Sequence, residues 1–231
     1  MSWSAIAGVV FDCDGVVADS EPVNAATWTK LLSRYGYRPT LEELEFAVGI
    51  SFGDTHATYA RRMPDLPTAA ELQPEADTIY LELLPALLRP FPDGTELARA
   101  LDDRGIPLAL ASSSTRRRLD ATLRLLELET LFSDTVAGDE VTRPKPDPEA
   151  YVRATQLLGT PSWQYLAIED SPTGLVAAAA AGLRTVGVQR PGRKLDPGSA
   201  DLILDDLREI LPNLPYLPRL TCEHNWSGTS T

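Results

Sequence analysis

The sequence has little cysteine, little histidine and no long apolar run. Its 231 residues include two cysteines, Cys13 and Cys222, and two histidines. Two cysteines cannot form a disulfide framework, so we expect a reducing compartment and a cytoplasmic protein. No apolar stretch reaches the length of a membrane span, and the N-terminus lacks the basic segment that begins a signal peptide. We therefore expect a soluble protein.

Basic residues are scarce relative to acidic ones. Lys and Arg number 21 against 33 Asp and Glu, which gives a formal net charge of -12 at pH 7. Such an acidic surface repels the phosphate backbone of nucleic acids and anionic lipid, so we expect neither nucleic acid nor membrane as a partner. A small anionic substrate stays possible, because its site needs only a local cation or metal. No heptad pattern or broad apolar stripe predicts an interface, and a monomer is the default expectation.

Strand-like and helix-like patterns alternate over most of the chain. Apolar runs typical of buried strands lie at 5–11, 106–111, 135–137, 165–168, 184–188 and 202–204. Segments of helical periodicity lie between most of them. This alternation predicts an α/β fold with a doubly wound parallel sheet.

The stretch between the first two strand-like runs has a different pattern. Residues 18–88 contain only helix-like segments, and Pro74 and Pro85 should break or kink the helix expected at 68–88. We therefore expect a Rossmann-like core domain of residues 1–17 and 89–231, with an all-helical cap domain, 18–88, inserted into it.

Polar residues follow four of the expected strands. They are Asp12 and Asp14 after the first run, then Ser112, Lys145, and the pair Glu169 and Asp170. The carboxyl ends of parallel strands share one edge of a sheet, where open α/β folds bind their ligands. We therefore expect these side chains to converge on one site.

The residue types at these positions suit phosphoryl transfer. Crowded carboxylates repel unless a cation holds them, and oxygen ligands next to a phosphate favour Mg²⁺. A carboxylate can attack phosphorus, and a second acid nearby can protonate the leaving oxygen and later deprotonate water. A lysine and a hydroxyl can neutralise the phosphoryl oxygens.

Four ordered segments resemble the motifs of the haloacid dehalogenase superfamily. They read F-D-C-D-G-V-V-A-D-S-E, L-A-S-S-S, K-P-D-P and I-E-D-S-P-T-G. The resemblance extends to about residue 210 and is closest to the helical-capped group of β-phosphoglucomutases and sugar phosphatases. It implies a Rossmann-like core with a helical cap and an enzyme that uses Mg²⁺ on a small phosphorylated metabolite.

The resemblance also implies a role for each motif residue. Asp12 would be the nucleophile, Asp14 the general acid and base, and Ser112 and Lys145 the groups that bind the phosphoryl oxygens. Mg²⁺ would be held by the Asp12 carboxylate, the Asp14 backbone carbonyl and Asp170, with Glu169 assisting directly or through water. Cys13 lies beside the nucleophile, and we expect it to pack rather than react.

Substrate choice should depend on residues beyond the motifs. The cap loop 49–54, with Gly49 and Ser51, should face the nucleophile, and Ser113 and Arg116 are further candidate substrate contacts. The run from Arg116 to Arg118 is more typical of a solvated helix face than of a substrate clamp.

Three positions differ from the mutases of the group. This chain has Asn24, Phe52 and Thr115 where those mutases have a His, an Arg that binds the second phosphate, and a Lys. Asp14, which the dehalogenases lack, favours a phosphate substrate. We therefore expect a phosphatase acting through an aspartyl-phosphate on a small metabolite such as a sugar phosphate. A phosphosugar mutase and a non-catalytic binding protein are the alternatives.

Overall fold

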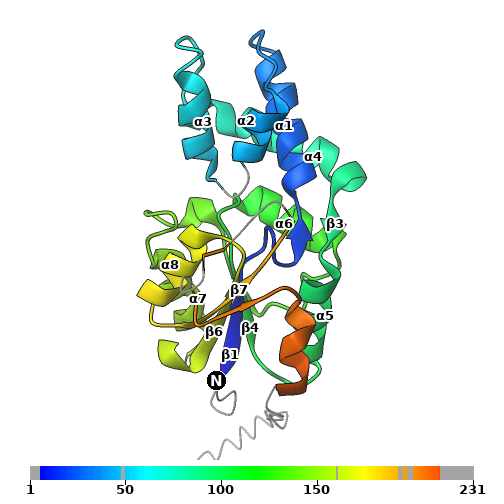
Figure 1. The fold of residues 1–231 in the computed structure, drawn as a ribbon, viewed down its shortest axis with the longest axis vertical. Coiled ribbons are helices and arrows are strands. Elements are labelled where there is room, and N and C mark those ends of the chain that lie inside the picture. The colour runs from blue at the N-terminus through cyan, green and yellow to red at the C-terminus, as the bar shows by residue number, and fades with distance from the viewer. Residues whose placement is uncertain (1–5, 48–49, 160, 192–194, 197–199, 214–231) are drawn as a thin grey trace, which may run out of the picture.

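The computed structural model describes residues 6–47, 50–159, 161–191, 195–196 and 200–213. A six-stranded sheet forms the centre of the larger part, and four helices form a separate group beyond one edge of that sheet (Figure 1). The strands are β1 Gly8–Phe11, β4 Leu108–Ala111, β5 Asp134–Val136, β6 Tyr165–Glu169, β7 Arg184–Val188 and β8 Leu202–Leu204.

All neighbouring strands of this sheet are parallel. Their order is β5-β4-β1-β6-β7-β8, which places β1 between β4 and β6. Every residue of these three strands is buried, as expected for parallel strands covered on both faces. The order reverses at β1, and ligands bind at such a switch point in open α/β sheets. The predicted doubly wound fold is confirmed.

Helices cover both faces of the sheet (Figure 1). The helical elements after residue 90 are α5 Pro92–Asp102, α6 Arg116–Leu125, η1 Gly138–Glu140, α7 Glu149–Leu158, η2 Ser162–Gln164, α8 Pro172–Ala180 and η3 Leu207–Asn213. Side chains alternate along each strand, so Val9 packs with the cluster that includes α5, α6 and η3, whereas Val10 packs with α7 and α8. Alanines of α8 allow that helix to lie close to the sheet.

The remaining helices are inserted between two short strands. The helices are α1 Glu21–Ser33, α2 Leu41–Phe46, α3 Phe52–Ala60 and α4 Ala69–Leu87, and the strands β2 Ala18–Asp19 and β3 Arg89–Pro90 pair antiparallel at their base. Trp28, Tyr59 and Leu72 belong to a separate apolar cluster of this helical group. The group therefore has its own core, and we call it the cap.

Helix α4 connects the two apolar cores. The helix is continuous through Pro74 and Pro85, so neither of these prolines breaks it. Thr68 caps its start with a capping box. Its C-terminal half contributes Tyr80 and Leu84 to the core of the sheet. None of the described helices is long and apolar enough to cross a bilayer.

Candidate active site

Strand β1 ends at the middle of the sheet and delivers Asp12, which is 6% exposed. Gly15 follows with φ of 89°, a conformation that favours glycine. A Cβ at Gly15 would lie 1.8 Å from Oδ2 of Asp170. Glycine therefore lets the loop after β1 lie directly against the acid that ends β6.

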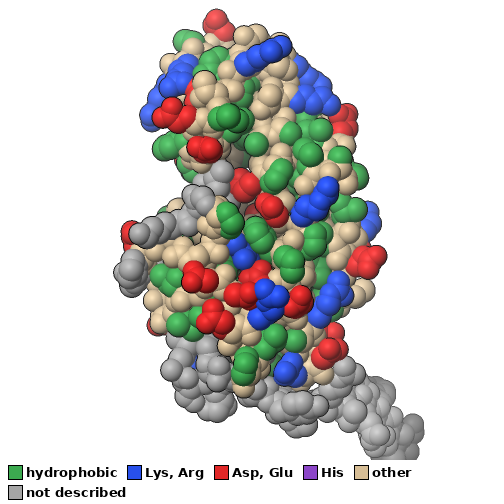
Figure 2. Space-filling view, turned by 45° about the vertical axis from the view of Figure 1, so that its right-hand side comes forward, with side chains coloured by type: hydrophobic (Ala, Val, Ile, Leu, Met, Phe, Trp, Pro, Cys, Tyr) green, Lys and Arg blue, Asp and Glu red, His purple; other side chains and the backbone are tan. Residues whose placement is uncertain are grey.

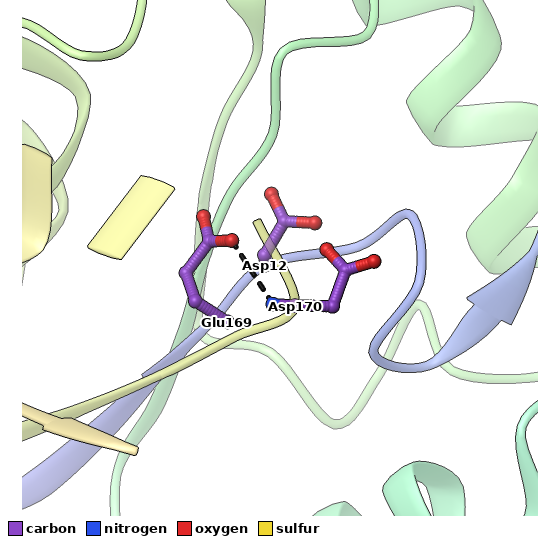
Figure 3. A group of neighbouring side chains, drawn as sticks. All are labelled: Asp12, Glu169 and Asp170. Carbon is purple, nitrogen blue, oxygen red and sulfur yellow. Dashed lines mark hydrogen bonds between the residues drawn. The ribbon is translucent and has the colours of Figure 1, made fainter. Parts of the chain in front are cut away.

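Three carboxylates meet where β1 and β6 end (Figure 3). One oxygen of each of Asp12, Glu169 and Asp170 lies within 4.8 Å of the others, and all three residues are buried. Buried acids at this separation repel one another unless a cation lies among them. Carboxylate oxygens are the ligands of hard divalent cations, so this donor set fits such a cation.

Lys145 supplies a positive charge to the same cluster. Its Nζ donates to Asp12 Oδ1 at 2.6 Å, to Glu169 Oε1 at 2.7 Å and to the carbonyl of Ala111 at 2.9 Å. Burial alone would lower the pKa of Lys145, but the charges of Asp12 and Glu169 raise it well above its ordinary value. The ammonium is therefore charged at neutral pH.

The protonation of Asp12 depends on the balance of its neighbours. Burial raises the pKa of Asp12 to about 7, and Glu169 and Asp14 add to the rise, while Lys145 opposes it. A divalent cation among these acids would favour the ionised carboxylate that a nucleophile needs.

Glu169 is fully buried, and both its oxygens accept hydrogen bonds. Tyr151 donates to Oε1 at 2.8 Å beside the bond from Lys145, while Oε2 accepts from the backbone of Asp170 and from the Ser171 hydroxyl. Gly174 leaves room for the carboxylate, since a Cβ there would lie 1.8 Å from Oε1. These bonds hold Glu169 in one orientation.

Asp14 lies among hydroxyl groups. Ser20 donates to its Oδ1 at 2.5 Å, and Ser114 and Ser112 donate to its Oδ2 at 2.9 and 3.4 Å. Ser112 is buried and also accepts a bond from the backbone nitrogen of Ser114. The carboxylate is thereby held at the edge of the sheet, beside Asp12.

Sequence reasoning did not single out Tyr151, Ser20 or Ser114 as parts of this cluster. Ser114 lies two residues after Ser112 in the same serine run, and Ser20 belongs to the first motif. Their positions in the motifs could therefore have identified both as site residues. Tyr151 had none, because only the packing of α7 brings its hydroxyl to Glu169.

A pocket of about 220 Å³ joins the carboxylate cluster to the cap. Its core side includes Asp12, Asp14, Ser113, Ser114, Lys145 and Asp170, and its cap side includes Asn24, Trp28, Ile50, Ser51, Phe52 and Asp54. Ser51 also caps α3 by accepting a bond from the backbone nitrogen of Asp54. The described part of the cap loop therefore faces the predicted nucleophile.

Three predicted substrate contacts, Ser112, Gly49 and Arg116, are not among the described residues that line this pocket. Gly49 lies outside the described residues. Arg116 instead donates to both oxygens of Glu140, at 2.9 and 2.7 Å, and to Thr135. The prediction of a solvated face is wrong for Arg118, which is 7% exposed and lines the pocket.

The surface has no continuous basic patch on the face drawn in Figure 2, as far as the described residues show. Acidic and basic side chains are interspersed there over the cap and the core.

Comparison with known proteins agrees with the motifs. Residues 6–182 match the family described as haloacid dehalogenase-like hydrolase. A phosphoglycolate phosphatase from Pseudomonas putida is 29% identical over 88% of this chain and 78% of its own. Hexitol phosphatase A from Escherichia coli is 28% identical over 88% and 92%. The crystal structure of CbbY from Rhodobacter sphaeroides in complex with phosphate superposes with a TM-score of 0.80 at 25% identity, covering 90% of this chain and 99% of that one.

Proposed function

Because the chain belongs to the haloacid dehalogenase-like hydrolase family, we propose that it is a Mg²⁺-dependent phosphatase. It hydrolyses a small phosphorylated metabolite, of the sugar phosphate class, through an aspartyl-phosphate on Asp12. The observation that carries this proposal is the convergence of Asp12, Lys145 and Asp170 in a pocket that also holds Asp14. The predicted family and the predicted hydrolase class are both confirmed.

The reaction takes two steps in this site. The Asp12 carboxylate attacks phosphorus, the P–O ester bond breaks, and Asp14 gives its proton to the leaving alcohol oxygen. Asp14 then takes a proton from water, which attacks the phosphoryl group and releases inorganic phosphate and free Asp12. Lys145, at 2.6 Å from Asp12, is placed to neutralise the charge of the transferring group.

The residues suited to hold Mg²⁺ are Asp12 and Asp170 through their carboxylates and Asp14 through its backbone carbonyl. Glu169 is better suited to orient them, because both its oxygens already accept hydrogen bonds. When bound, the cation neutralises negative charge among the carboxylates and the phosphoryl oxygens.

The pocket favours a phosphatase over a mutase. A mutase needs a second phosphate site, yet the described pocket residues contributed by the cap include no Lys or Arg. Asn24 and Phe52 line the wall where the mutases of the group carry a His and an Arg. Hydrolysis needs one phosphate site and access for water.

Pocket size and relatives support a small substrate. A cavity of about 220 Å³ is below the usual 300–1,000 Å³ of ligand pockets and suits a compact metabolite. The relatives named for phosphoglycolate and hexitol phosphates act on molecules of that size.

Release of inorganic phosphate from a panel of sugar and short-acid phosphates tests the proposal. We expect release by the purified protein with Mg²⁺, little after chelation, and none above background for Asp12→Asn. Asp102→Asn, at an exposed aspartate of α5, is the matched control and should retain activity. An isomerised sugar phosphate without phosphate release would establish the mutase, and activity retained in Asp12→Asn would refute the mechanism.

A further inference from the structure

A second buried charge lies in the pocket, away from the phosphoryl site. Arg118, on α6 of the core, donates from Nε to Asp77 Oδ1 on α4 of the cap at 2.6 Å. The two residues are 7% and 5% exposed. The guanidinium also lies 4.6 Å from the ring centre of Tyr80 and 5.8 Å from that of Phe52. Aromatic rings and a carboxylate thus fix its position.

One edge of this guanidinium has no partner within the described residues. Nη2 of Arg118 is buried and makes no hydrogen bond there. Asp77 accepts from Nε of Arg118 but not from Nη2, and its oxygens also accept from Gln73 and Thr115. Buried donors in folded proteins are nearly always paired, so this one calls for an acceptor from water, an ion or a bound molecule.

The residue that carries this donor lines the pocket. Arg118, Gln73 and Thr115 line the same cavity as Asp12 and Lys145. A molecule whose phosphate lies at Asp12 therefore extends toward Arg118 with its other end. That end must offer an acceptor atom to complete the hydrogen bonding of Nη2.

Charge decides which kind of acceptor fits. Asp77 already neutralises the Arg118 guanidinium, and Arg118 and Lys145 are the cations among the described lining residues. Glu21 and Asp54 line the cap side and repel a second phosphate. A neutral hydroxyl or carbonyl oxygen meets no such repulsion.

The neighbouring wall suits a carbohydrate chain. Trp28 and Phe52 stack with ring centres 4.7 Å apart and an interplanar angle of 19°, and both line the pocket. Flat aromatic faces pack against the C–H groups of a polyol, while Nη2 of Arg118 takes one of its oxygens.

We propose that Arg118 is a specificity-determining residue that donates from Nη2 to a hydroxyl or carbonyl oxygen at the non-phosphorylated end of the substrate. The pocket thereby selects hydroxylated monophosphates over alkyl monophosphates and over bisphosphates. This inference rests on the proposed phosphatase function.

Steady-state kinetics on matched substrates test the contact. Sorbitol 6-phosphate and hexyl phosphate have the same length, and the second lacks the hydroxyls. For Arg118→Met we expect kcat/KM for sorbitol 6-phosphate to fall roughly tenfold or more, mainly through KM, as expected when a charged donor is lost. For hexyl phosphate it should change less than about twofold. Arg117→Met, at the exposed neighbour on α6, should change neither.

A double variant separates this contact from folding. Asp77→Asn with Arg118→Met leaves no buried unpaired carboxylate and should show the same selective loss as Arg118→Met alone. An equal fall on both substrates would assign Arg118 a structural role only, and no fall on either would show that the substrate does not touch it. Either result overturns the inference while leaving the phosphatase intact.

The predicted discrimination against bisphosphates can be tested separately from the Arg118 variants. Fructose 1,6-bisphosphate should be a poorer substrate than fructose 6-phosphate by roughly tenfold or more in kcat/KM. Asp77→Asn leaves the positive charge of Arg118 without its neutralising carboxylate. The ratio of kcat/KM for the two substrates should therefore shift in favour of the bisphosphate. A wild-type preference for the bisphosphate overturns the inference. Release of phosphate from none of these compounds refutes the proposed function itself, and the inference with it.

Discussion

Arg190 donates from its Nε to the backbone carbonyl of Gly15 at 2.6 Å, across 175 residues of sequence. Its Nη2 donates to the carbonyl of Val16, and its Nη1 donates to both carboxylate oxygens of Asp93. The guanidinium lies 4.0 Å from the ring centre of Phe91. A residue from the end of β7 therefore holds the loop that carries Asp14 and leads into the cap.

Replacing Arg190 should destabilise the fold. Arg190→Met leaves Asp93 buried without its cation and two loop carbonyls without their donor, so we expect a loss of about 3 kcal/mol or more in the free energy of unfolding. Urea titration of the purified protein measures it. Arg208→Met removes an exposed arginine paired with Asp206 and should cost less than about 1 kcal/mol. Equal losses for the two variants would contradict a bracing role.

The cluster of polar side chains at the end of the sheet was predictable because each of its main residues has a local signal. Asp12, Ser112 and Asp170 each follow a strand directly, Asp14 lies two residues after Asp12, and a parallel sheet brings such ends to one edge. The sheet itself was predictable because buried parallel strands are continuous apolar runs separated by amphipathic helices. The helical cap was predictable from the absence of such runs.

Residues that act across elements could not be predicted in the same way. Arg190 and Tyr151 reach the site through packing between segments far apart in sequence, which no local pattern encodes. Arg118 was hidden in a run of three arginines. Arg118 lies one turn before Thr122 on the buried face of α6, and this spacing could have predicted that its side chain is buried.

Asp170 should determine the affinity for Mg²⁺. Asp170→Asn removes one charge from the carboxylate cluster, so we expect the Mg²⁺ concentration for half-maximal activity to rise by about tenfold or more. Mg²⁺ should also raise the melting temperature of the wild-type protein and have a smaller effect on the variant, because a cation that binds the folded state stabilises it. An unchanged Mg²⁺ dependence would remove Asp170 from the metal site.

The pair between Arg116 and Glu140 should make stability depend on pH. Hydrogen bonds from Arg116 hold the pKa of Glu140 below its ordinary value of 4.5. A lowered pKa in the folded state means that the stabilisation is complete above pH 4.5 and is lost as the pH falls through the lower folded value. Glu140→Gln should therefore cost about 1 kcal/mol at pH 7, since the pair is partly exposed, and less at pH 4.

Urea unfolding of the wild type and of Glu140→Gln at both pH values checks this. Glu129→Gln, which removes an exposed acid 3.7 Å from Arg124, is the control and should show little difference at either pH. A cost of Glu140→Gln that grows as the pH falls would contradict the sign of the shift.

Cys13 lies between Asp12 and Asp14, yet it should be chemically inert. It is 1% exposed, and burial raises its pKa well above the ordinary value, with Asp14 and Asp12 adding to the effect. The thiolate that reacts with alkylating agents is therefore rare at neutral pH. Iodoacetamide at pH 8 should leave Cys13 unmodified in the native protein, as read by mass spectrometry of peptides, and modify it in urea.

Cys13→Ala should retain phosphatase activity within about threefold and lose roughly 1 kcal/mol or more of stability, because a buried side chain is shortened. Rapid labelling of native Cys13, or loss of activity in Cys13→Ala without loss of folding, would instead give the thiol a part in the reaction.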